Sequence, residues 1–163
     1  MGVTGCGKST LGQALALRLG WRFVEGDALH PEANIAKMAA GRPLDDEDRG
    51  PFLDNVARAI GVARAGGVVL SCSALKRGYR DRLRSAVPEL VFVLPRVSRA
   101  ALEQRLQQRT GHFMPAALLH SQLAILEPLQ ADEAGMEIDG EAATDAQVRA
   151  VIAAAGAAGL IRN

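Results

Sequence analysis

The sequence is poor in cysteine and aromatic residues, and it contains no long apolar run. Its 163 residues include two cysteines, one tryptophan and one tyrosine. Cys6 and Cys72 have no CxxC spacing, which excludes a disulfide framework and argues against a structural zinc site. No apolar run approaches the ~20 residues of a membrane span, and the N-terminus has no secretory signal pattern. We therefore expect a reduced, cytoplasmic protein with no membrane partner.

An excess of charge of one sign is also absent. The chain has 19 basic and 18 acidic side chains, giving a formal net charge of +1. This balance provides no general attraction to nucleic acid, so nucleic acid is not expected as a partner. Apolar residues make up 48% of the chain, which is typical of a folded protein rather than a disordered one. The length fits one domain over residues 1–163.

Short apolar runs alternate with longer helical patterns along the chain. The runs are expected to be strands and cover 21–24, 68–70, 90–94 and 136–138. The helical patterns cover 8–19, 31–40, 51–65, 76–86, 98–108, 115–126 and 144–158. This order predicts an α/β fold of three layers, with a parallel sheet between helices. Pro51 is expected in a first helical turn and Thr144 as an N-cap.

The strongest motif is Gly2-Val3-Thr4-Gly5-Cys6-Gly7-Lys8-Ser9, which fits the phosphate-loop pattern G-x-x-x-x-G-K-[ST]. The glycines let backbone N–H groups point at phosphate oxygens, and the following helix adds its positive N-terminal dipole. Lys8 is expected to reach the β- and γ-phosphates, and Ser9 to place its hydroxyl on Mg²⁺. The motif, extended to Thr10, therefore predicts a nucleoside triphosphate site in which Cys6 is a small residue pointing away from the phosphates.

A buried strand normally precedes a phosphate loop, and here only Met1 precedes Gly2. Five buried apolar residues of such a strand would contribute ~8–15 kcal/mol, at ~1.5–3 kcal/mol each. That is comparable with the whole net stability of a domain. We therefore expect the natural protein to start upstream and the first strand to be missing from these residues.

Four further segments narrow the class of nucleotide-binding protein. They are 25–38 (EGDALHPEANIAKM), 43–49 (PLDDEDR), 71–80 (SCSALKRGYR) and 105–114 (RLQQRTGHFM), followed by Gln122 and 126–128. Together with the phosphate loop, these segments closely resemble the gluconokinase family of small P-loop kinases, from Gly2 to about Pro128. Phe52 departs from the family, which usually has tryptophan there. The resemblance implies a nucleotide-kinase-like fold, ATP and Mg²⁺, D-gluconate as the acceptor that becomes 6-phospho-D-gluconate, and a homodimer.

Phosphoryl transfer to a sugar hydroxyl suggests catalytic roles for Lys8, Asp27, Arg105 and Arg109. Asp27 follows a predicted strand and is expected to act as general base or to hold Mg²⁺ through water, the alternative being a helix cap. Arg105 and Arg109 stand four residues apart on a helix and are expected to stabilise transferring charge, the alternative being a solvated basic helix. Residues 28–60 are expected to form an acceptor-binding insertion, and 99–127 a lid.

The carboxylate of the acceptor requires a cation, and the sequence leaves four candidates open: Lys37, Arg49, Lys76 and Arg80. The other expected substrate contacts are Asp27, His30, Ser73, His112 and Gln122. Two other functions also stay open. One is a different small-acceptor kinase, of the shikimate or nucleotide type, and the other is a nucleotide-binding regulatory module without kinase activity. Measuring which acceptor, if any, stimulates ATP turnover would discriminate among these functions.

Overall fold

The computed structural model describes residues 1–108 and 116–159. The strands are β1 (Arg22–Glu25), β2 (Val68–Ser71), β3 (Phe92–Arg96) and β4 (Gly135–Asp139). The helices are α1 (Lys8–Leu19), α2 (Glu32–Ala39), α3 (Asp46–Ala63), α4 (Arg77–Ala86), α5 (Arg99–Gln107), α6 (Ala116–Ile125) and α7 (Thr144–Ala157). Turns of 3₁₀ helix cover Gly26–Leu29 and Arg64–Gly66. In this part of the chain, no helix is both long and apolar enough to cross a membrane.

All strand pairs of the described residues are parallel. β1 pairs with β2, with Phe23 opposite Val69, and β3 pairs with β4, with Leu94 opposite Glu137. Parallel neighbours require a crossover connection, which α2 and α3 provide for the first pair and α5 and α6 for the second. The α/β class predicted from the alternation of strands and helices is thus confirmed.

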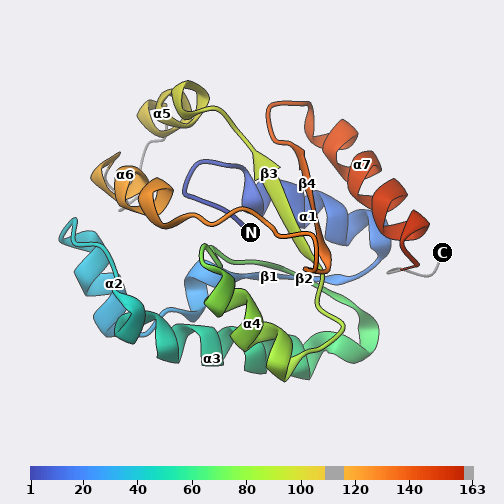
Figure 1. Ribbon diagram of the computed structural model, residues 1–163, viewed down its shortest axis with the longest axis horizontal. Coiled ribbons are helices and arrows are strands. Elements are labelled where there is room, and N and C mark those ends of the chain that lie inside the picture. The colour runs from blue at the N-terminus through green and yellow to red at the C-terminus, as the bar shows by residue number, and fades with distance from the viewer. Residues whose placement is uncertain (109–115, 160–163) are drawn as a thin grey trace.

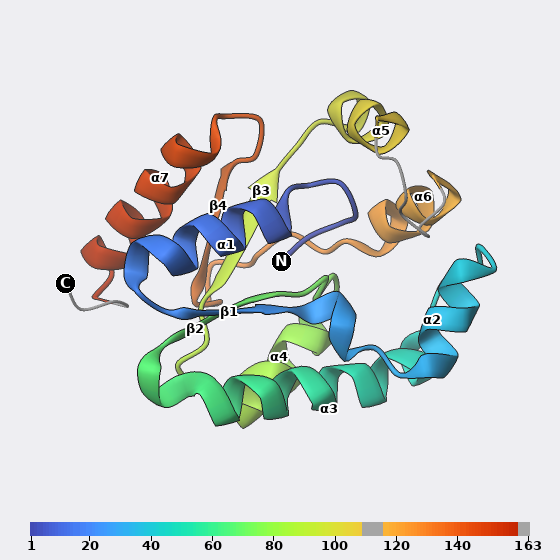
Figure 2. The same ribbon diagram turned by 180° about the vertical axis from the view of Figure 1, so that it is seen from behind.

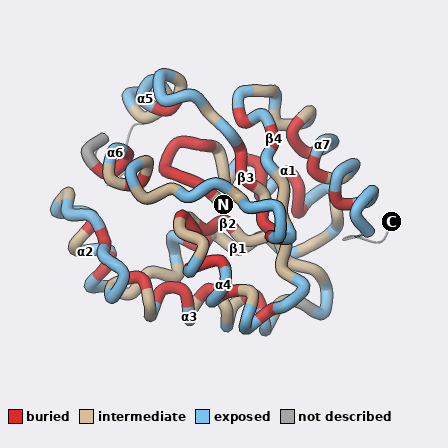
Figure 3. The backbone as a smooth tube through the Cα atoms, in the orientation of Figure 1, coloured by how far each residue is buried: buried red, intermediate tan, exposed pale blue. Residues whose placement is uncertain are grey.

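Helices cover both faces of the strands, in three layers (Figures 1 and 2). α1 and α7 pack together on one face, where Val69 and Val93 join their apolar cluster. α3 and α4 pack together on the other face, where Val68 and Leu70 join a second cluster. Adjacent residues of β2 therefore face opposite layers, as the two-residue period of a strand requires. The buried segments of the tube in Figure 3 lie on the inward sides of these helices.

The two strand pairs are separate, because β2 and β3 share no ladder among the described residues. The start of the chain contacts both pairs. The Met1 amino group donates to the carbonyl of Val93 in β3 at 2.5 Å. The Gly2 amide donates to the carbonyl of Ser73, in the loop after β2, at 3.0 Å. Burial lowers the pKa of the Met1 amino group to about 6. An apolar cavity of about 300 Å³ lies here, with β2 and β3 among its walls.

The helix boundaries agree with the sequence pattern to within two residues, except at the start of α3. α3 begins at Asp46 rather than at Pro51, which lies inside the helix. Asp45 caps it: the Asp48 amide donates to Asp45 Oδ1 and the Asp45 amide to Asp48 Oδ2, both at 2.9 Å. The prediction of Thr144 as an N-cap is also wrong, because Ala143 occupies that position and no side chain caps α7.

Candidate active site

The phosphate loop is a turn that leads directly into α1. Gly5 and Gly7 have φ of 81° and 95°, a region that residues with a Cβ adopt only under strain. No side chain caps α1 at Gly7, so the first amides of the helix remain available to an anion. Val3 and Cys6 are buried in an apolar cluster with Leu75. These two side chains anchor the loop, while its backbone faces the site.

A cavity of about 290 Å³ opens beside this loop. Five parts of the chain that are distant in sequence meet in its walls: the phosphate loop, the end of β1 with the segment after it, the α2–α3 region, the loop after β2, and α6. The lining residues are Thr4, Gly5, Gly7, Lys8, Ser9, Glu25, Asp27, His30, Met38, Pro43, Leu44, Arg49, Ser73, Leu118, Ser121 and Gln122. Figure 2 shows α2 and α6 on the same side of the molecule as the loop before α1. The carboxyl ends of β1 and β2 border this cavity, as expected for a ligand site in a parallel sheet.

Gly26 brings Asp27 to this edge of the sheet. A Cβ on Gly26 would lie 1.8 Å from the Ser71 carbonyl oxygen, so only glycine fits there. The Gly26 amide also donates to Ser71 Oγ at 3.0 Å. The neighbouring Asp27 lines the cavity, and within 1–108 and 116–159 its carboxylate has no hydrogen bond or ion pair. Asp27 therefore does not cap a helix through its side chain, and its carboxylate is available to a ligand in the cavity.

His30 is held neutral in the cavity wall. Its ring stacks on Phe52, with the ring centroids 3.7 Å apart and the planes 8° from parallel. Burial lowers the pKa of His30 to about 4; nearby Asp27 opposes this shift, and Arg49 adds to it. A neutral imidazole at pH 7 has one donor and one acceptor nitrogen, which suits hydroxyl groups. Phe52 thus keeps an aromatic face at the position where the family usually has tryptophan.

Arg49 is the predicted cation that the structure leaves unpaired in the cavity wall. It is 6% exposed, and its Nε has no hydrogen-bond partner among the described residues. Its guanidinium carbon lies 5.7 Å from the centre of the Tyr79 ring. A buried guanidinium without a carboxylate is costly. The site thus retains an unsatisfied positive charge that an anionic ligand can neutralise.

Lys37 and Lys76 differ from Arg49, because acidic residues of the chain already neutralise them. Lys37 binds Asp45 at 2.9 Å and also binds Asp48. Lys76 binds both carboxylate oxygens of Asp46, at 2.7 and 2.8 Å. These carboxylates raise the pKa values of both lysines. The structure does not place either lysine in the cavity wall.

Arg80, the fourth candidate cation, does not line the cavity. Its side chain is fully buried and forms an ion pair with Glu133, whose side chain is also fully buried. It therefore has no surface to offer a ligand. The sequence placed Arg80 on the same helical face as Lys76, but it gave no signal for Glu133, which lies 53 residues away.

Two helices that follow β3 reach the phosphate loop. On α6, Gln122 Oε1 accepts a hydrogen bond from the Thr4 amide at 2.6 Å. On α5, Arg105 donates to the Gly5 carbonyl at 3.4 Å and to the Gly140 carbonyl at 2.9 Å. Lys8 Nζ donates to the Val3 carbonyl at 2.9 Å.

The remaining predicted residues fall in different places. Ser73 lines the cavity, whereas Thr10 is exposed on α1 outside its wall. Arg109 and His112 lie outside the described residues. Sequence reasoning missed Glu25 and Ser121 as wall residues. Glu25 could have been found from its place at the end of β1, next to Gly26, but Ser121 carries no motif.

The donor set beside the loop suits Mg²⁺ together with a nucleotide. The hydroxyl of Ser9 and the carboxylates of Glu25 and Asp27 line the same cavity. Mg²⁺ prefers oxygen ligands and is commonly held by one or two carboxylates together with substrate phosphates. Among the described residues, no group of three or more His, Cys, Asp or Glu side chains forms a metal site by itself. The residues therefore fit a metal that arrives with the phosphates.

Comparisons with known proteins agree with this arrangement. A family model described as an AAA domain matches residues 1–129. A gluconokinase from Gluconobacter oxydans (strain 621H) is 49% identical over 157 residues, which cover 93% of this chain and 86% of that protein. An unliganded sugar kinase from Janibacter sp. HTCC2649 has a TM-score of 0.90 at 39% identity, covering 100% of this chain and 96% of the other. A gluconokinase from Sinorhizobium meliloti 1021 has a TM-score of 0.87 at 44% identity, covering 96% and 89% respectively. The chain belongs to the gluconokinase family.

Proposed function

We propose that this protein transfers the γ-phosphoryl group of ATP to D-gluconate, giving ADP and 6-phospho-D-gluconate. The observation that carries the proposal is the buried Arg49, which has no ion-pair partner among the described residues and lines the same cavity as the phosphate loop and Asp27. A guanidinium binds a carboxylate in a bidentate manner, so Arg49 distinguishes a sugar acid from a neutral sugar. The relatives named gluconokinase support this choice of acceptor.

On the nucleotide side, the loop amides and the N-terminus of α1 hold the phosphates. Lys8, which bonds the Val3 carbonyl in this structure, turns to the β- and γ-phosphates when ATP binds. Mg²⁺ bound with ATP would neutralise phosphate charge, and Ser9 is the residue that would hold it. Arg105 lies against the loop at Gly5, where its charge stabilises the transferring phosphoryl group.

On the acceptor side, Arg49 fixes the gluconate carboxylate, while neutral His30 and Ser73 bind hydroxyl groups. Asp27 accepts the proton of the attacking hydroxyl as the new oxygen–phosphorus bond forms, while the bond between the γ-phosphorus and the β,γ-bridging oxygen breaks and ADP leaves. Gln122 lies between the two sides, since it lines the cavity and also bonds the Thr4 amide. The acceptor insertion at 28–60, the lid at 99–127 and the homodimer stay predictions.

The test is ADP release from Mg-ATP by the purified chain, with D-gluconate, shikimate, AMP or no acceptor. We expect gluconate alone to stimulate release, and phosphorus NMR to detect a phosphate monoester of gluconate. The Lys8→Met variant is the control for a contaminating kinase and should abolish the stimulation. Stimulation by shikimate or AMP instead would assign a different acceptor. Slow release that no acceptor stimulates would favour a regulatory module.

A further inference from the structure

The mechanism above gives no role to Arg80 and Glu133, the buried ion pair that joins α4 to the segment before β4. Arg80 Nε donates to Glu133 Oε1 at 2.6 Å, and Arg80 Nη2 donates to Glu133 Oε2 at 2.8 Å. Both side chains are fully buried. Removing two charges from water is expensive, so a pair of this kind is weak evidence for stability alone. The backbone contacts of Arg80 indicate a more specific purpose.

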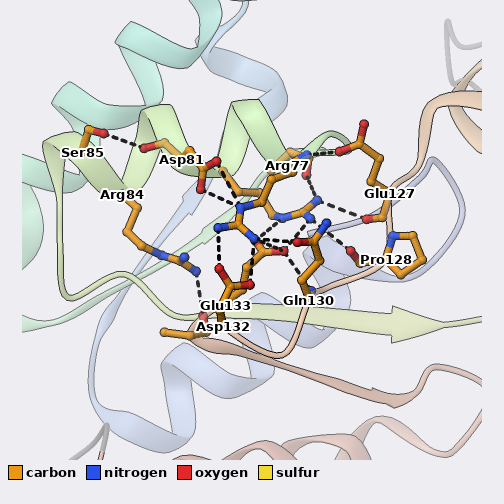
Figure 4. A network of polar contacts seen from close by, with 12 residues as sticks. Arg77, Asp81, Arg84, Ser85, Glu127, Pro128, Gln130, Asp132 and Glu133 are labelled. Atoms are coloured by element: carbon orange, nitrogen blue, oxygen red, sulfur yellow. Dashed lines mark hydrogen bonds and ion pairs between the residues drawn. The ribbon is translucent and has the colours of Figure 1, made fainter.

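The guanidinium of Arg80 holds two backbone segments together. Its acceptors are the carbonyls of Ala74 at 3.4 Å, Leu75 at 3.3 Å, Glu127 at 3.2 Å and Pro128 at 3.2 Å. The first two belong to the loop after β2, and the last two follow α6. The Glu127 amide also donates to the Leu75 carbonyl at 2.9 Å, so the two segments contact each other directly. Figure 4 shows Glu127, Pro128 and Glu133 gathered around this network.

The loop that Arg80 holds borders the candidate active site. Ser73 lines the cavity, and its carbonyl accepts from the Gly2 amide of the phosphate loop at 3.0 Å. Ala74 has φ of 39°, the only positive φ outside glycine among the described residues. A residue with a Cβ adopts this conformation at a cost and keeps it only when its surroundings fix it. Leu75 is fully buried in the cluster that also anchors Val3 and Cys6.

Glu133 is in turn fixed from a second direction. The Gln130 amide donates to Glu133 Oε2 at 3.0 Å. These contacts lower the pKa of Glu133, with the hydrogen bonds from Arg80 as the largest cause. A lysine at position 80 could not replace the arginine, because one ammonium group cannot span carbonyls and a carboxylate in several directions. The guanidinium geometry is therefore what joins the two segments.

We propose that Arg80 is a positioning residue for phosphoryl transfer: with Glu133, it fixes the strained loop of Ser73, Ala74 and Leu75 between the phosphate loop and the segment after α6. This inference rests on the proposed function for its kinetic consequences. Arg80 acts through the loop and touches neither ATP nor the acceptor. It thus orients Ser73 toward the acceptor.

The experiment compares Arg80→Lys with Arg82→Lys, a matched change on the same helix at an exposed arginine that pairs with Asp54. Steady-state kinetics with each substrate varied are measured well below the melting temperature of each variant. We expect Arg80→Lys to lower kcat/KM for gluconate by about 30–100-fold, because small misplacements of reacting groups are costly. The KM for ATP should change by less than about threefold, because none of the hydrogen-bond acceptors of Arg80 among the described residues belongs to the phosphate loop. Arg82→Lys should match the original protein.

Hydrogen exchange gives a readout that does not depend on activity. The Glu127 amide should exchange at least about tenfold faster in Arg80→Lys, because its acceptor Leu75 is no longer fixed. Folded Arg80→Lys with gluconate kinetics within about threefold of the original would overturn the proposal. If Arg80→Lys does not fold, Glu133→Gln decides by the same two readouts. If the unmodified chain shows no gluconate-dependent activity, the proposed function fails, and exchange at Glu127 alone decides: faster exchange supports the positioning role, and unchanged exchange overturns it.

Discussion

Two cavities of nearly equal volume differ in what lines them. The cavity of about 300 Å³ between β2 and β3 has mainly aliphatic walls, including Leu70, Leu83 and Val93. The cavity of about 290 Å³ beside the phosphate loop brings together cationic, anionic and hydroxyl groups. Converging polar groups, rather than cavity volume, therefore identify the site of chemistry. Substitutions in the wall of the apolar cavity should mainly change stability, and substitutions in the wall of the polar cavity should mainly change catalysis.

The largest expected effect is at Lys8, which lines the polar cavity and also borders the apolar one. Lys8→Met removes the charge that reaches the phosphates in the transition state, so kcat should fall by about 10³-fold. Lys8 is not part of an apolar cluster, so the melting temperature should stay nearly constant. Kinetics and thermal unfolding of the same preparation check both parts. A variant with kcat within about tenfold of the original would contradict the placement of the phosphates at this loop.

A matched pair of leucine substitutions compares the two cavities directly. Leu83 is 1% exposed in the wall of the apolar cavity, and Leu118 is 3% exposed in the wall of the polar one. Leu83→Ala should cost about 3 kcal/mol of unfolding free energy and lower the melting temperature by roughly 6–12 °C. Its KM values should stay unchanged. Leu118→Ala should lower stability and also raise the KM for the acceptor. Equal changes in the acceptor KM for Leu83→Ala and Leu118→Ala would contradict the distinction between the two cavities.

The pH dependence of stability gives an intermediate effect at His30. Its pKa is about 4 in the folded protein and near 6.5 when unfolded. As pH falls from 6.5 to 4, the unfolded chain therefore binds a proton that the folded chain does not, and stability decreases. The full shift corresponds to about 3 kcal/mol, and we expect roughly half of it because the ring is only partly buried. Asp27 and Arg49 are the charged groups that affect this titration.

His30→Gln should flatten this part of the pH profile, as measured by denaturant unfolding between pH 4 and 7. His120→Gln is the control, because His120 is exposed. The Met1 amino group, with a pKa lowered to about 6, adds its own loss of stability as pH falls from 8 to 6. That contribution is common to all variants, so differences between profiles isolate His30. Equal profiles for His30→Gln and the original protein would contradict a buried neutral imidazole.

The smallest expected effect is at Lys37. Its charge is already neutralised by Asp45 and Asp48, and it does not line the polar cavity. Lys37→Met should therefore change the KM for gluconate by less than about threefold. Steady-state kinetics with gluconate varied provide the measurement. A rise of about 30-fold or more would show that Lys37 leaves its two aspartates to bind the acceptor.

The sequence predicted the fold well, because local signals determine each element. Helix α1 begins and ends where the phosphate loop and Gly20 place it. Pro51 predicts a first helical turn, whereas the reciprocal bonds of Asp45 and Asp48 start α3 earlier, at Asp46. Such bonds depend on backbone geometry as well as on residue type.

The candidate site was only partly predictable, because charge pairing depends on contacts between distant segments. The sequence offered four cations for one carboxylate. Lys76 pairs with Asp46, 30 residues away, and Arg80 pairs with Glu133, 53 residues away. Neither partner is indicated by a motif. Arg49 is distinguished only by the absence of such a partner among the described residues, which no sequence pattern reveals.

The most direct test of the account compares gluconate with its neutral amide as acceptors, in the original protein and in Arg49→Met. Initial rates of ADP release give kcat/KM for each acceptor. The account predicts that the original protein prefers gluconate by about 100-fold, since a charge-assisted bidentate contact is worth several kcal/mol when buried. Arg49→Met should lose this preference by becoming poor with gluconate while changing little with the amide. A variant that still prefers gluconate as strongly as the original protein would contradict the assignment of Arg49 as the carboxylate-binding residue.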